Sequence, residues 1–218
     1  MTYDDIKNNE EIKTYIRKAD EALTALGYTE HSFAHVTKVA SDAEYILRTL
    51  GYPEHEIELV KIAAYLHDIG NVINRTDHSQ SGAVMAFRIL DRLQMPAEDI
   101  AAIICAIGNH DEGTGVPVDA VSAALIIADK SDVRRSRVRN QAHETFDIHD
   151  RVNYSVKEAV LTVDNNKKSL MLSLTVDTAI SSIMDYFEIF LDRMLLCRKA
   201  SEKLGLKFCL NINGQNLL

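Results

Sequence analysis

Histidine and aspartate side chains occur at the ends or on the apolar faces of five separate segments whose residues follow a helical period. His67 and Asp68 come directly after the apolar run 60–66, where an unpaired buried aspartate would be costly. One such residue is usually a helix cap or a satisfied core residue, and this pair alone fits a helix end that faces water. Five independent occurrences make that interpretation hard to sustain. The candidates are His35, His67, Asp68, His78, His110 and Asp129.

The combination of imidazole and carboxylate groups indicates which ion these residues would hold. Mixed nitrogen and oxygen ligands suit iron, manganese, zinc, cobalt or nickel better than magnesium or calcium alone. The sequence therefore predicts a site for a divalent transition metal.

The elements that must position these residues are helical up to about residue 154. Apolar residues recur there every three to four positions, and glycine or proline marks several segment ends. Residues 155–176 instead alternate polar and apolar residues around Asp164-Asn165-Asn166, which predicts a β-hairpin; a long amphipathic helix (177–205) and a strand (206–213) follow. We therefore expect a mainly α fold, with a helical domain (1–154) that carries the metal site and a small C-terminal ββαβ module (155–218). The helical segments are 3–27, 32–51, 53–70, 79–94, 96–110 and 119–137.

Composition narrows the class of protein. The 218 residues are 46% hydrophobic and 26% charged, as in an ordinary globular protein. The net charge of −8 argues against binding of extended nucleic acid, which needs a basic surface. No apolar run is long enough to cross a membrane, and the three scattered cysteines fit reduced core residues. We expect a cytoplasmic protein with no membrane contact.

The order of the candidate ligands leads to a resemblance. His35, then His67-Asp68, then Asp129, in the stretches HVTKVA, LHDIG and IIADKSD, resemble the H…HD…D signature of the HD superfamily of metal-dependent phosphohydrolases. The resemblance covers about residues 25–150. It implies an all-helical core with a central metal site. It also implies hydrolysis of a phosphate ester or anhydride by a metal-activated hydroxide, with a nucleotide as the expected substrate class.

His78 and His110 extend this resemblance to the members of the superfamily that bind two metals. The extended pattern is similar to the symmetrical diadenosine tetraphosphate hydrolases and, more distantly, to the HD-GYP phosphodiesterases. It implies two ions, iron or manganese first and zinc, nickel or cobalt as alternatives, with Asp68 as the bridging and catalytic residue. The implied ligands are His35, His67, Asp68 and Asp129 for one ion, and Asp68, His78 and His110 for the other.

A phosphate substrate also needs cationic partners, and a basic cluster follows Asp129. Lys130 and Arg134 are predicted to face the site, because Lys and Arg are the usual phosphate ligands. Arg137 and Arg139 are expected to point away. The alternative is a solvated helix face that pairs with nearby acidic residues.

Three polar residues near these motifs have less certain roles. Arg151 is a candidate substrate contact, or it is tied to acidic neighbours. Asn71 stands where many HD hydrolases carry lysine, so we predict that it contacts the phosphate without supplying charge. His31 lies four residues before His35, so on a continuous helix both would face the same way. It is either a further ligand or an exposed first-turn residue.

Two other functions remain open at this point. Some proteins of the same fold are mixed-valent di-iron oxygenases and use the same ligand types. A non-catalytic metal- or nucleotide-binding sensor is the third possibility. We expect a small phosphorylated partner, and a homodimer through the C-terminal module is a further expectation.

Overall fold

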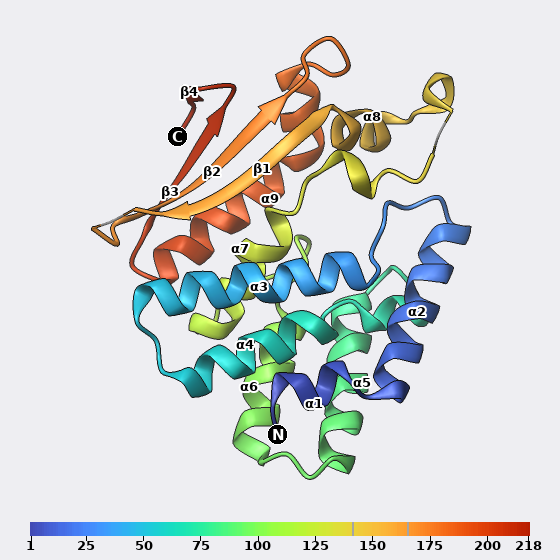
Figure 1. Cartoon of the computed structure of the whole chain (residues 1–218), viewed down its shortest axis with the longest axis vertical. Helices are drawn as coiled ribbons and strands as arrows, with labels where there is room; N and C mark the ends of the chain where they lie inside the picture. Colours follow the sequence, from blue (N-terminus) through green and yellow to red (C-terminus); the bar gives the residue numbers. More distant parts are fainter. Residues whose placement is uncertain (141, 165) are drawn as a thin grey trace.

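The computed structural model describes residues 1–140, 142–164 and 166–218, and it has a helical part below a small sheet (Figure 1). Short 3₁₀ helices interrupt or follow the α-helices: η1 (Ile69–Val72), η2 (Arg135–Arg137) and η3 (His143–Thr145). The α-helices of this part are α1 (Tyr3–Lys7), α2 (Glu10–Ala25), α3 (Phe33–Leu50), α4 (Glu54–Leu66), α5 (His78–Arg92), α6 (Ala97–Gly108) and α7 (Ala120–Lys130).

Helix α7 occupies the centre of the molecule. It packs against α3, α4, α6 and α9, and all of residues 121–130 are buried. A helix that is apolar on all sides is stable only when it is surrounded in this way. The few polar residues of α7 are therefore held inside the protein, next to the residues that converge on it.

The C-terminal part forms a four-stranded sheet that α9 covers on one face (Figure 1). Strand β1 pairs antiparallel with β2, β2 pairs parallel with β3, and β3 pairs antiparallel with β4. Helix α9 connects the two parallel strands. Helix α8 (Ile148–Ser155) leads into β1 (Val156–Val163), and β2 (Ser169–Val176), α9 (Ile183–Lys203), β3 (Lys207–Ile212) and β4 (Gln215–Asn216) follow.

The predicted fold class, mainly α with a small β module, is confirmed. Strand β4 adds a short edge strand that the sequence did not indicate, and Asn165 of the predicted hairpin turn lies outside the described residues. One hydrophobic core runs through the helical part and the module. The division into a domain of residues 1–154 and a module of residues 155–218 stays a prediction. No described helix is long and apolar enough to span a membrane.

Several predicted helices have different ends in the structure, for local reasons. The predicted helix 3–27 divides into two because the side chain of Asn9 accepts hydrogen bonds from the amides of Glu11 and Ile12 and starts a new helix. The predicted helix 177–205 begins only at Ile183, where Ser182 and Asp185 form a capping box. The predicted helix 119–137 ends at Lys130.

The predicted helix 53–70 also ends early, because η1 lies very close to α5 at Gly70. A Cβ atom on Gly70 would overlap the backbone oxygen of His78 and lie 2.5 Å from the nitrogen of Gly82. Gly82 is itself tightly packed against η1. Glycine is therefore needed here for space, and the close approach places His78 beside the end of α4.

We expect Gly70→Ala to lower the free energy of unfolding by about 3 kcal/mol, the upper range for an overpacked site, because backbone atoms cannot move aside as a flexible side chain can. Chemical denaturation followed by circular dichroism measures this. Gly108→Ala is the matched control, since its Cβ would have no neighbour closer than 3.8 Å. Equal stability of the two variants would contradict the close packing of η1 on α5.

Candidate metal centre

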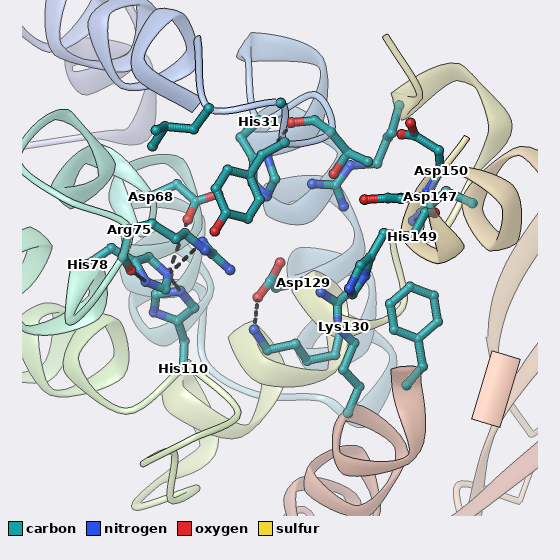
Figure 2. A pocket seen from close by; sticks show the side chains of 18 residues that line it. His31, Asp68, Arg75, His78, His110, Asp129, Lys130, Asp147, His149 and Asp150 are labelled. Carbon is teal, nitrogen blue, oxygen red and sulfur yellow. Dashed lines mark hydrogen bonds and ion pairs between the residues drawn. The ribbon is translucent and has the colours of Figure 1, made fainter. Parts of the chain in front are cut away.

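The six predicted ligands come together inside the helical part, and each is at most 8% exposed. Figure 2 shows Asp68, His78 and His110 on one side of a cavity and Asp129 near its middle. These residues come from five different helices. His35 lies on α3, His67 and Asp68 follow α4, His78 begins α5, His110 follows α6, and Asp129 lies on α7.

Hydrogen bonds at Nδ1 determine the tautomer of the four histidines. The atom opposite each Nδ1 is an oxygen, which can only accept a hydrogen bond. Each Nδ1 therefore carries a proton and donates it. In the neutral ring the lone pair is then at Nε2, the atom that binds a metal. The acceptors are the carboxylate of Asp132 for His35 (2.7 Å) and the backbone oxygens of Ala64 for His67 (2.7 Å), Arg75 for His78 (3.1 Å) and Ile107 for His110 (2.6 Å).

The Nε2 atoms turn inward to the carboxylates. His67 Nε2 lies 3.1 Å and His35 Nε2 3.5 Å from Asp68 Oδ2, while His78 Nε2 lies 3.6 Å from Asp68 Oδ1. Asp68 therefore presents one oxygen to two histidines and the other oxygen to a third. Ligand atoms lie within 4.8 Å of one another in two overlapping groups: His35, His67 and Asp129, and His67, Asp68 and His110.

Several of these atoms have the surroundings of metal ligands. His35 Nε2, His67 Nε2 and Asp68 Oδ2 are buried and have no hydrogen-bond partner among the described residues, although buried polar atoms are nearly always paired. His78 Nε2 and His110 Nε2 lie 3.1 Å apart, where two neutral rings would oppose their lone pairs. A divalent transition metal satisfies both features, so the residues present fit such an ion.

The charges of the cluster also favour a cation. Burial alone would lower the pKa of His67, but the carboxylates of Asp68 and Asp129 raise it to about 10. Burial alone would raise the pKa of the two carboxyl groups. His67 beside Asp68, and Lys130 beside Asp129, hold these pKa values well below the usual range. A proton on His67 and a metal ion compete for this place, because a ligating histidine must be neutral.

Asp132 orients His35 and has no counterpart among the predicted site residues. Its carboxylate is 1% exposed, accepts from His35 Nδ1 and also accepts from Arg134 Nε at 2.8 Å. The chain turns after Lys130, and this turn places Asp132 next to His35 of α3. The predicted role of Arg134 as a phosphate ligand needs correction: its guanidinium is bonded to Asp132 and Glu30, and Arg134 does not line the cavity.

Asn71 also has a different role from the predicted phosphate contact. It is 2% exposed, and its amide nitrogen donates to the backbone oxygen and to Oδ1 of Asp68, both at 2.9 Å. Asn71 does not line the cavity. Its side chain holds Asp68 in place, because a second hydrogen bond, from Arg75 to Asn71 Oδ1 at 3.3 Å, fixes the orientation of the amide.

The cavity beside the cluster has a volume of about 420 Å³. Among the described residues, four cationic side chains line it: Arg75, Lys130, Arg137 and Arg193. Lys130 was predicted to face the site, and it does so with Nζ bonded to Asp129 at 2.7 Å and to Glu112 at 3.1 Å. Arg137, expected to point away, instead lies in the wall, where its guanidinium donates to backbone oxygens of Glu30 and Asp132.

Other polar residues show where sequence patterns were insufficient. Arg151 does not line the cavity and lies 3.7 Å from Asp185, so its predicted substrate contact needs correction. His31 lines the cavity, with its ring 5.5 Å from that of His35 and its Nδ1 donating to the backbone oxygen of Thr29. Arg75 and Arg193 were missed, because one arginine in a loop or on an amphipathic helix looks like an ordinary surface residue.

Helix α9 gives the C-terminal module a part in this cavity. Phe190 and Arg193 line it, and Arg193 forms an ion pair with Glu112, which in turn pairs with Lys130. The guanidinium of Arg193 lies 4.4 Å from the centre of the Phe190 ring. The module therefore closes one wall of the cavity.

We expect Asp132→Asn to weaken metal binding by about 10- to 100-fold, the usual effect of changing a residue that orients a ligating histidine. The charge that favours the Nδ1 proton of His35 is lost, while the side chain keeps its shape. Competition with a chromophoric chelator measures the affinity, and circular dichroism checks folding.

Asp99→Asn is the matched control for this variant. Asp99 Oδ1 accepts from the exposed His55 at 2.8 Å in a similar His-Asp pair far from the cluster. A loss of metal affinity in Asp99→Asn as large as in Asp132→Asn would show that the effect does not come from His35.

Comparison with known proteins identifies the family of this chain. The model of the HD domain family matches residues 32–188. A curated relative, the uncharacterized protein MJ1020 of Methanocaldococcus jannaschii, is 28% identical over 177 residues, which span 68% of this chain and 66% of that protein. A solved structure of a predicted HD superfamily hydrolase from an uncultured Thermotogales bacterium is 24% identical, with a TM-score of 0.45 over 57% of this chain and 67% of the other. Because the family match covers more than half of the chain, this protein belongs to the HD domain family.

Proposed function

We propose that this protein is a metal-dependent phosphohydrolase that acts on a phosphate ester or anhydride of a small molecule, with nucleotides as the first class to test. One observation carries the proposal. Four imidazole Nε2 atoms and two carboxylates converge beside a cavity whose wall also carries arginine and lysine side chains. Membership of the HD domain family supports hydrolysis.

The ligand arrangement supports two ions, with iron or manganese as the first expectation. His35, His67, Asp68 and Asp129 would hold one ion, and Asp68, His78 and His110 the other. Asp68 suits the shared position because its two oxygens face different histidines. When bound, such ions polarise a phosphoryl oxygen and lower the pKa of a coordinated water.

The cationic residues of the wall would hold the phosphate. Lys130 and Arg137 are each 4% exposed, and partly buried cations bind anions more strongly than exposed ones because water screens them less. Their existing bonds to Asp129, Glu112 and backbone oxygens keep them in place. The phosphate would therefore meet donors that are already oriented.

The proposal is tested with metal-loaded protein and a panel of phosphate compounds that includes mononucleotides, dinucleoside polyphosphates, cyclic dinucleotides and simple phosphate esters. We expect phosphate release without dioxygen, and complete loss of release in Asp68→Ala. Metal analysis by mass spectrometry is expected to give two ions per chain. Turnover that consumes dioxygen and needs iron would instead indicate the oxygenase alternative, and absence of any turnover would support a sensor.

A second test addresses the cationic wall. Arg193→Gln is expected to reduce kcat/KM for phosphate substrates by about 10- to 100-fold. This factor corresponds to the free energy that one hydrogen bond to a charged group contributes. Arg198→Gln on the same helix is the control, because Arg198 is exposed and lies outside this cavity. Steady-state kinetics separates the two variants, and equal kcat/KM values for both would remove Arg193 from substrate binding.

A further inference from the structure

The cavity changes its chemical character from one side to the other. The metal ligands Asp68, His78 and His110 lie on one side, whereas Asp147, His149 and Asp150 lie on the opposite side (Figure 2). The second group comes from the start of α8. It has no part in metal binding or phosphate binding as proposed above.

The hydrogen bonds that the two carboxylates on the far side accept come from uncharged groups. Asp147 caps α8 and accepts from the backbone nitrogen of Asp150 at 2.7 Å, and Asp150 accepts from the amide of Asn140 at 3.3 Å. Within residues 1–140, 142–164 and 166–218, no lysine or arginine lies within ion-pair distance of either carboxylate. The neighbouring Arg151 is directed to Asp185.

The electrostatics of Asp150 agree with this lack of lysine and arginine partners. Burial raises the pKa of Asp150, and the charge of Asp147 raises it further, against the hydrogen bond from Asn140 and the effect of the nearby His149. A carboxylate in this situation is stabilised by a positively charged partner. Asp147 and Asp150 therefore offer an unused binding site for a cation at the cavity wall.

The same cavity also reaches the candidate metal ligands. Asp68 lines it, is 4% exposed and has an Oδ2 atom without a hydrogen-bond partner among the described residues. Tyr28 and Phe190 add aromatic surface to the wall. A small molecule in this space would meet the candidate metal ligands on one side and the carboxylates of Asp147 and Asp150 on the other.

We infer that the substrate is a phosphate ester whose other end carries a positively charged amino group, which Asp147 and Asp150 bind. This inference rests on the proposed phosphohydrolase function, because that function places the phosphate at the metal side. The far carboxylates would attract an ammonium group, repel a carboxylate and bind a hydroxyl group less strongly than an ammonium group. They would thus select among phosphate esters without contacting the phosphate.

The test uses metal-loaded protein and three series of linear alkyl phosphates of graded chain length, which end in an amino, a hydroxyl or a carboxyl group. At the best chain length, we expect kcat/KM for the amino ester to exceed that for the hydroxyl ester by about tenfold, which corresponds to about 1.4 kcal/mol. The carboxyl ester is expected to be the poorest substrate. Hydrolysis without this order, or no hydrolysis of these esters by protein that hydrolyses a compound of the panel above, would overturn the inference and leave the proposed function intact. No hydrolysis of any compound in either set would overturn both.

Variants assign the preference to residues. The double variant Asp147→Asn, Asp150→Asn keeps a good helix cap and is expected to lose the preference for the amino ester. Asp150→Lys is expected to favour the carboxyl ester over the amino ester, an inversion that structural damage alone would not produce. The ratio of kcat/KM values is taken within each variant, so a general loss of activity cancels.

Asp119→Asn is the matched control, because Asp119 caps α7 through its side chain and lies outside the cavity. It is expected to keep both the activity and the preference of the unmodified protein. A preference that survives in the double variant, or that disappears in Asp119→Asn, would overturn the assignment to Asp147 and Asp150.

Discussion

Burial of the Asp68 carboxylate is the constraint on which the rest of the structure depends. A buried charge is tolerated only when it is paired or binds a metal. Asn71 fixes one oxygen, and histidines from separate helices face both oxygens. Each of these helices must therefore end or pass at one point, and the glycine contact between η1 and α5 allows His78 to reach it. The fold is in this sense an arrangement of helix ends around a single carboxylate.

Sequence patterns indicated the candidate ligands because these residues interrupt otherwise apolar helices. A histidine beside Val36, or an aspartate after 121–128, contradicts the helical pattern and therefore stands out. The same reasoning could not find Arg193, because a charged residue on an amphipathic helix agrees with the pattern for an exposed face. Whether such a residue reaches a cavity depends on how α9 packs against α7, and local sequence contains no such information.

The positions of Asn71 and Arg134, which differ from those expected of phosphate contacts, have a related cause. Both residues follow a candidate metal ligand closely along the chain, and proximity in sequence suggested direct contact with substrate. In the structure the chain turns directly after each ligand, so that Asn71 binds Asp68 from behind and Arg134 binds Asp132 from outside. The sequence predicted one continuous helix through residues 119–137, so it did not indicate the turn after Lys130. Tertiary hydrogen bonds, such as the bond between Asp132 and His35, determine where some helices end. The spacing of apolar residues in the sequence does not reveal such bonds.

The two sides of the cavity differ in rigidity as well as in charge, and this difference bears on specificity. Lys130 and Arg137 are held by anchored acceptors, so under the proposed function the donors for a phosphate would be preorganised and would cost little to orient. Asp147 is exposed and caps the short helix α8, with few fixed partners. Phe190 and Arg193 lie beyond the residues that the family model matches. Under the proposed function, substitution at the far wall would therefore change which organic group is accepted, while the proposed metal ligands and phosphate donors keep their geometry.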